Sequence, residues 1–173
     1  MKKIFKMNKK TIFGIGFLLV FILTATFFNS FLSKSLDYIS AIYASVLSNL
    51  ANIDRASQNI DELKTNPLLV NAAQMKADDM ARRGYFSHDT PEGLTPWYWF
   101  DKAGYQYKYA GENLAVNFDD SQDIEEAWMA SPKHRWNILN RNFTEIGIAT
   151  STGIYQGRET IFVVQMFGLP TGK

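Results

Sequence analysis

The chain has 173 residues, of which 46% are hydrophobic and 14% aromatic. This length and composition suit one packed domain with an extension and exclude a disordered chain. The formal net charge is +1, but five of the 18 basic residues are lysines among the first ten positions, so residues 11–173 carry 13 basic and 17 acidic groups. A body with a net charge of −4 offers no positive surface for phosphates, and we therefore expect no nucleic acid partner.

An uncharged, apolar run follows the basic cytoplasmic segment 1–10, and the next charged residue is Lys34. We assign residues 11–32 to a transmembrane anchor or signal sequence, because a run of roughly 20 apolar residues can span a membrane as a helix. Phe27 and Phe28 stand near its end, where signal peptidase requires small residues, which favours an uncleaved anchor. We expect a single-pass membrane protein with its C-terminal domain outside, or a secreted protein if the segment is cleaved.

The segment after this run predicts the start of an exported domain. Residues 36–58 have apolar positions in steps of three and four, which predicts an amphipathic helix. We assign residues 33–44 to a stalk and helix start, residues 45–170 to a single domain, and the polar stretch 59–66 to a linker. The chain has no cysteine, so core packing alone must hold this domain together.

Two helices are predicted next. The first begins at Asn66-Pro67, which are preferred N-cap and first-turn residues, and ends before Gly84. The second is short and aromatic, begins around Trp97 and stops at Gly104. The tryptophans Trp97, Trp99 and Trp128 are predicted to be core residues. The predicted core face of the first helix consists of Leu69, Ala72, Ala73, Ala77 and Met80.

The C-terminal half predicts strands as well as helices. Residues 105–116 read as a strand or extended segment, followed by a helix capped by Ser121 and a short helix from Pro132. Residues 145–150 and 160–167 are rich in Ile, Val and Phe, which predicts an antiparallel hairpin with Gly153 and Gly157 in its turn. Helices flanking a few late strands give an α+β fold class.

The chain has only two histidines, His88 and His134, and each ends or lies within a dense motif. His88 closes Gly-Tyr-Phe-Ser-His, His134 lies in Ser-Pro-Lys-His-Arg, and Glu112 stands between them in Gly-Glu-Asn-Leu. Two imidazoles and a carboxylate can bind a divalent metal such as zinc or perform acid–base chemistry. A surface-turn histidine at 88 and a helix-terminal histidine at 134 are the alternatives.

Taken together, the motifs resemble those of the CAP superfamily, which comprises cysteine-rich secretory, antigen 5 and pathogenesis-related 1 proteins, and especially its cysteine-free bacterial branch (SCP-like domains). The similar segments follow the family order over residues 45–168. They are Ala73-x-x-x-Ala77-x-x-Met80-Ala81, Tyr85-Phe86-Ser87-His88, Gly111-Glu112-Asn113-Leu114-Ala115, Ala127-Trp128-Met129-x-Ser131-Pro132-x-His134-Arg135-x-Asn137-Ile138-Leu139, Phe143-x-x-Ile146-Gly147-Ile148 and Val164-Gln165-x-Phe167-Gly168.

This resemblance implies a three-layer α-β-α sandwich with a central antiparallel sheet and a shallow cleft lined by two histidines and two acids. Carried onto this sequence, the candidate tetrad is His88, Glu112, Asp123 and His134, with the two histidines as metal ligands. Asp123 stands where the family usually has glutamate, so its shorter carboxylate would need a bridging water. Alternatively, the acids only hold the histidines in place around a bound water.

Three functions remain open from the sequence. The first is a binding module whose exported cleft takes up a divalent metal, zinc foremost, and an extracellular ligand such as a lipid, a cell-wall component or a protein. The second is a metal-dependent hydrolase of peptide or cell-wall substrates, in which one acid is the general base. The third is a structural envelope protein whose tetrad braces a loop. No reaction follows from the fold alone, so we assign no catalytic residue.

Overall fold

The computed structural model describes residues 18, 20–28 and 44–172. The chain divides into two compact units, Met1–Ile39 and Ser40–Lys173. In the first unit, residues 20–28 form a helix whose side chains are mostly exposed. The basic segment 1–10 and much of the predicted anchor 11–32 and stalk 33–44 lie outside the described residues. Among the described residues, no helix combines the length and the apolar character needed to cross a membrane.

Helix α2 (Pro67–Arg83) begins and ends where the sequence predicts. The side chain of Asn66 accepts a hydrogen bond from the backbone N–H of Leu68 at 2.8 Å, and Pro67 brings no N–H that needs a partner. Gly84 ends the helix in the left-handed conformation, with φ 67°, which glycine adopts at little cost. The predicted core face of this helix is confirmed, since each of its residues is 0% exposed.

Four strands form one sheet in the order β1-β3-β4-β2. Strands β2 (Tyr107–Val116) and β3 (Glu145–Tyr155) both run antiparallel to β4 (Arg158–Pro170), whereas the short β1 (Lys64–Thr65) runs parallel to β3. The sheet is therefore mixed, where the resemblance implies an antiparallel one. The predicted linker 59–66 is wrong in its second half, because Leu63 is buried and the next two residues pair with β3.

The predicted β3–β4 hairpin is confirmed, but its turn lies further along the chain than expected. Tyr155 pairs with Arg158, and the two residues between them, Gln156 and Gly157, both have positive φ angles of 51° and 79°. Gly153 lies inside β3, not in the turn. A Cβ atom at Gly153 would come within 2.4 Å of the Ala81 backbone oxygen, so this glycine lets the strand approach α2 closely.

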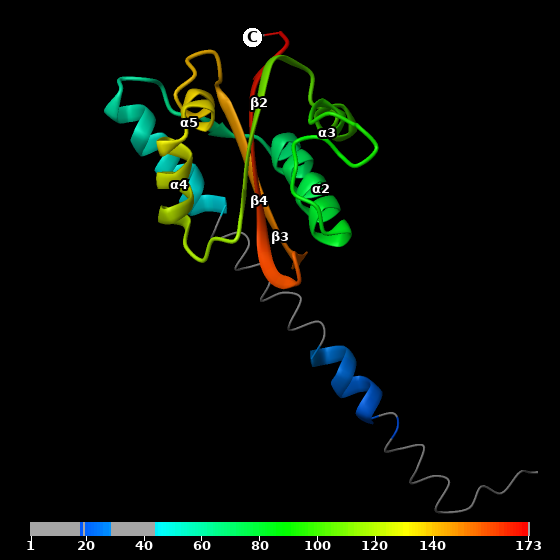
Figure 1. Ribbon diagram of the computed structural model, residues 1–173. Helices are drawn as coiled ribbons and strands as arrows, with labels where there is room; N and C mark the ends of the chain where they lie inside the picture. Colours follow the sequence, from blue (N-terminus) through cyan, green and yellow to red (C-terminus); the bar gives the residue numbers. More distant parts are fainter. Residues whose placement is uncertain (1–17, 19, 29–43, 173) are drawn as a thin grey trace, which may run out of the picture. The chain divides into compact units, whose positions relative to one another are not determined.

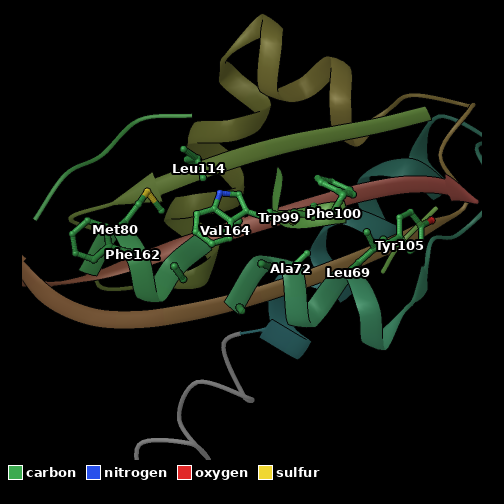
Figure 2. Close-up of a cluster of buried hydrophobic side chains, with 13 residues drawn as sticks. Leu69, Ala72, Met80, Trp99, Phe100, Tyr105, Leu114, Phe162 and Val164 are labelled. Atoms are coloured by element: carbon green, nitrogen blue, oxygen red, sulfur yellow. The ribbon is translucent and has the colours of Figure 1, made fainter. Parts of the chain in front are cut away.

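Helices cover both faces of the sheet, which gives the α+β architecture visible in Figure 1. On one face, α2 and α3 (Trp97–Ala103) pack against a cluster that includes Leu114 and Val164 (Figure 2). On the other face, the helix over residues 44–57 and helix α4 (Ser121–Ala130) pack against a second cluster that includes Val163. Neighbours along β4 thus point to opposite faces, as strand geometry requires.

The other predicted elements are confirmed, with small corrections, where the structure describes them; the first part of the predicted helix 36–58 lies outside the described residues. Helix α5 (Pro132–Ile138) begins at the predicted proline. The N-cap of α4 is Asp120, not Ser121, because the Asp120 side chain accepts a hydrogen bond from Gln122 N–H at 2.6 Å. Trp99 and Trp128 are buried as predicted. The prediction is wrong for Trp97, which is 40% exposed.

Arg55 fastens the helix over residues 44–57 to the segment that follows α5. Its guanidinium is 1% exposed and donates hydrogen bonds to the backbone oxygens of Asp61, Ile138, Asn140 and Phe143 at 2.8 to 3.1 Å. A buried guanidinium that satisfies four carbonyl groups fixes several backbone segments at once. The position of α5, which carries His134, therefore depends partly on this helix.

Candidate functional site

His88 lies in the loop that leaves α2, and a buried lysine holds its backbone. The ammonium group of Lys76, on α2, donates hydrogen bonds to the backbone oxygens of Ser87 and His88, both at 2.8 Å. Lys76 is 0% exposed, and burial lowers the pKa of its amine, while the nearby carboxylate of Glu112 acts in the opposite direction. The imidazole of His88 itself remains half exposed, so the loop is fixed while the ring stays accessible.

Side chains at the end of α2 form a second set of contacts that hold the loop. The hydroxyl group of Tyr85 donates a hydrogen bond to the carboxylate of Asp79 at 2.8 Å. The same carboxylate forms ion pairs with Arg82 at 2.7 Å and with Arg83 at 3.2 Å. Arg83 also pairs with Glu92, beyond the histidine. Burial and the hydrogen bond to Asp79 raise the pKa of Tyr85, so its phenol stays protonated as a donor. The Gly84–Glu92 segment is thus held at both ends.

Glu112 points from β2 toward His88. Its Oε1 lies 2.7 Å from the Nδ1 atom of His88, and its side chain is only 2% exposed. Its second oxygen, Oε2, is buried and has no hydrogen-bond partner among the described residues. Burial raises the pKa of Glu112, and the hydrogen bond from His88 and the charge of Lys76 oppose that rise. Because Nδ1 is engaged by the carboxylate, Nε2 is the nitrogen of His88 left for a ligand.

His134 lies on α5, which two asparagines join to β2. Asn113, 0% exposed, donates a hydrogen bond to the backbone oxygen of His134 at 3.2 Å. Asn137 donates to the backbone oxygen of Glu112 at 3.0 Å and to the side-chain oxygen of Asn113 at 2.8 Å. Burial and, second, the charge of His88 lower the pKa of His134. The imidazole of His134 is therefore held in its neutral form near pH 7.

These three side chains line one cleft. His88, Glu112 and His134 share a cavity of about 510 Å³ with Pro132, Lys133, Trp136 and Asn137. A second cavity of about 450 Å³ shares His88, Glu112, Trp136 and Asn137 with the first and extends toward α3. The structure therefore brings together three of the four residues that the sequence proposed.

The fourth, Asp123, lies elsewhere. It is exposed in the first turn of α4 and lines neither cavity. The cause is the helix register: Ile124 and Trp128 are four residues apart and face the core, so their neighbour at position 123 faces solvent. Glu125 on the same helix is buried, but it lies beside Asp54 of the helix over residues 44–57. Of the two acids of the candidate tetrad, Glu112 therefore lines the cleft and Asp123 does not, while Asp89 lines the second cavity.

The donors in the cleft fit a weakly held metal better than a closed metal centre. Within residues 18, 20–28 and 44–172, no three His, Cys, Asp or Glu side chains are arranged to hold a metal ion. A neutral imidazole at His134 and a carboxylate-oriented imidazole at His88 are the donor types that zinc prefers. They would supply two protein ligands and leave the other coordination positions to water or to a ligand.

Sequence reasoning missed Lys76, although a signal for it exists. Lys76 stands four residues after Ala72 and four before Met80, so it lies on the apolar face of α2. A charged residue on such a face needs buried partners. The backbone oxygens that it meets belong to the histidine loop, which no local pattern reveals.

A model of the cysteine-rich secretory protein (CAP) family matches residues 49–167. The chain is 37% identical to the Bacillus subtilis protein YkwD over 106 residues, which make up 61% of this chain and 41% of YkwD. It is 26% identical to the B. subtilis membrane protein YlbC over 107 residues, or 62% of this chain and 31% of YlbC.

A solved structure gives a similar result. The crystal structure of an extracellular protein containing an SCP domain from Bacillus anthracis superposes with a TM-score of 0.65 and 29% identity. The superposition covers 75% of this chain and 41% of that protein. The chain therefore spans less than half the length of each of these three relatives, and the likeness concerns the domain that carries the cleft.

Proposed function

The chain belongs to the cysteine-rich secretory protein (CAP) family, and on this premise we propose that it is an exported, membrane-anchored binding module. In this proposal, its cleft takes up a divalent cation, zinc foremost, together with an extracellular ligand. The similarity to one extracellular protein and one membrane protein supports export and anchoring. The basic segment and the apolar run at the N-terminus support the same orientation, with the domain outside.

The observation that carries the proposal is the contact between His88 and Glu112. A carboxylate that accepts a hydrogen bond from one imidazole nitrogen fixes the ring and directs the other nitrogen outward. Here that nitrogen belongs to a half-exposed ring in a cleft that also contains His134. The arrangement is suited to capturing a ligand from outside.

The same geometry supports binding over hydrolysis. A metal-dependent hydrolase of the kind considered above needs one acid to help hold the metal and another to act on bound water. Only Glu112 among the candidate acids lines the cleft, and its Oε1 is already engaged by His88.

Calorimetric titration with zinc, calcium and magnesium at pH 7.5 and 5.5 tests the metal part of this proposal. We expect zinc to bind at pH 7.5 and more weakly at pH 5.5, because protons compete for the imidazoles. Calcium and magnesium prefer oxygen ligands and should bind poorly. The double variant His88→Ala/His134→Ala should lose zinc binding, and the control Glu126→Gln, a change at an exposed glutamate on α4, should retain it. Zinc binding that survives in the double variant or is equal at both pH values contradicts histidine ligation.

A further inference from the structure

Two tryptophans flank the cleft with their rings in solvent. Trp136 on α5 is 64% exposed and lines both cavities, and Trp97 at the start of α3 is 40% exposed and lines the second. The other two tryptophans of the chain are buried. Large aromatic rings left in water forgo a favourable burial free energy, so their clustering at one groove points to a partner that covers them.

Both indole rings pack against other aromatic side chains of the domain. Trp97 packs against Phe100 and Tyr107 with ring centroids 5.8 Å and 6.2 Å away. Trp136 meets the ring of Phe143 edge-on, at 6.5 Å and 84°. Such contacts restrict the rotamers of the two indoles before any ligand arrives. A preorganised ring loses little entropy on binding, which is the property of an anchor residue.

The two cavities adjoin and form one groove, because they share His88, Glu112, Trp136 and Asn137. We call it the tryptophan groove. Trp97 lies in its α3 end and His134 in its α5 end. A groove with two aromatic platforms and a polar centre suits an extended chain of repeating units better than one small compact molecule.

The polar groups of the groove define the chemistry of that chain. The formal charges that line it are mixed, with Lys133 in the first cavity, Asp89 in the second and Glu112 in both, so a polyanion gains little. Glu112 Oε2 is a buried acceptor without a partner, which a hydroxyl or amide donor can satisfy. An acyl chain would leave that oxygen unsatisfied. A pyranose sugar has both features that this groove requires. Its hydroxyl groups donate hydrogen bonds at the edge of the ring, and its flat C–H faces can stack on indole rings.

We propose that the tryptophan groove binds an extended glycan chain, with sugar rings stacked on Trp97 and Trp136 and a sugar donor on Glu112 Oε2. The inference rests on the proposed function of this cleft as a binding site and names the class of its extracellular ligand. Apolar faces against indoles supply affinity, and the single buried acceptor sets the register of the chain along the groove.

The four tryptophan indole N–H signals in a ¹⁵N-labelled sample provide the test. The full chain, kept in a detergent without a sugar headgroup, is titrated with the β-1,4-linked hexamer of glucose and with that of N-acetylglucosamine. We expect at least one hexamer to shift the Trp97 and Trp136 signals and to leave those of the buried Trp99 and Trp128 in place. A response to either sugar supports the inference and identifies the preferred substituent.

Variants make the result specific. Trp136→Ala should weaken the hexamer's affinity at least ten-fold, and Trp97→Ala should also weaken it. Tyr98→Ala is the matched control, since Tyr98 is 37% exposed on the same helix as Trp97 but lines neither cavity. The inference is overturned if neither hexamer shifts the two signals, if all four signals shift alike, or if the Trp97→Ala/Trp136→Ala double variant binds normally.

Zinc titration separates this inference from the proposed function. Histidine-dependent zinc binding without any sugar response overturns the glycan inference and leaves the metal-binding cleft standing. A sugar response that persists in a chelator, in a chain that does not bind zinc, supports the glycan inference and removes the metal from the proposed function. A fatty acid that shifts the same two indole signals when both sugars fail assigns the groove to lipid and overturns the inference.

Discussion

The ammonium group of Lys76 lies 2.8 Å from the backbone oxygen of His88, so a fully buried cation supports one of the two histidines of the cleft. On the other side, the amide of Asn113 donates to the backbone oxygen of His134. Both histidines are thus fixed through their main chains by buried side chains. Glu112 orients the ring of His88, and both imidazoles line the cleft in which we propose that the ligand binds.

Lys76→Met should destabilise the domain by about 2–4 kcal/mol, because it removes the buried, charged donor that binds the backbone oxygens of Ser87 and His88. The change keeps the length and most of the volume of the side chain. Urea unfolding followed by circular dichroism measures the loss. Lys108→Met, a change at an exposed lysine on β2, should alter the free energy of unfolding by less than about 0.5 kcal/mol. Equal stability of the two variants would show that Lys76 does not support the histidine loop.

The pKa of His134 should lie below the usual histidine value of about 6.5, and removing the neighbouring charge should raise it. Proton NMR can follow both histidines easily, because the chain has only two. In His88→Gln, the His134 titration should move toward higher pH, although burial, the larger cause, keeps it below the value in the urea-unfolded chain.

The lowered pKa of His134 has a defined consequence for stability. The folded state binds the His134 proton more weakly than the unfolded state does. The neutral imidazole therefore stabilises the fold at pH values above the pKa of the unfolded chain, and this stabilisation is lost as the pH falls through the pKa of the folded protein. A His134 midpoint equal to that of the unfolded chain would contradict the burial of its imidazole.

The sequence predicts best those elements whose signals are local. Asn66, Pro67 and Gly84 mark the ends of α2 because each acts on its own backbone turn. Strand β1 has no such signal: two residues become a strand only by pairing with Glu145 and Ile146, far along the chain. The residue type alone predicts a turn at Gly153, whereas the missing side chain there lets the backbone of α2 approach β3 closely.

The residues of the candidate site also differ in how far the sequence predicts them. The motifs place His88, Glu112 and His134 in the right order, and the structure brings them into one cleft. The family resemblance assigns Asp123 to the second acidic position, but the register of α4 turns it toward solvent. No sequence pattern predicts a role for Trp136, because only the fold shows that this ring, next to the histidine motif, remains exposed.

Gly147→Ala should destabilise the domain by about 1–3 kcal/mol or more, the cost of overpacking a core. A Cβ atom there would lie 2.2 Å from the Leu69 carbonyl carbon and 2.3 Å from the Val70 nitrogen, and both are helix backbone atoms that cannot rotate away. Thr152→Ala, at an exposed position on the same strand, is the control and should be nearly neutral. Thermal unfolding of the two variants measures the difference. If Gly147→Ala is as stable as the control, α2 does not pack on β3 as closely as the structure shows.

Glu125 gives the domain a pH dependence of its own. Its side chain is buried on α4 and lies near Asp54 of the helix over residues 44–57. Burial, with the nearby charge of Asp54 as the second cause, raises the pKa of Glu125 to about 8. The carboxyl group is therefore protonated in the folded state and ionised in the unfolded state at neutral pH.

Stability should accordingly fall as the pH rises from about 4.5 toward about 8, because folding must take up a proton in that window. Glu125→Gln removes the proton uptake while preserving shape. At pH 8.5 it should raise the free energy of unfolding by at least about 1.4 kcal/mol, the equivalent of one pKa unit. At pH 4.5, where the wild-type carboxyl group is neutral, the two proteins should be nearly equal. Glu126→Gln, at the exposed neighbour, should follow the wild-type profile. If Glu125→Gln and wild type lose stability in parallel over this range, Glu125 is ionised in the folded state and another group causes the pH dependence.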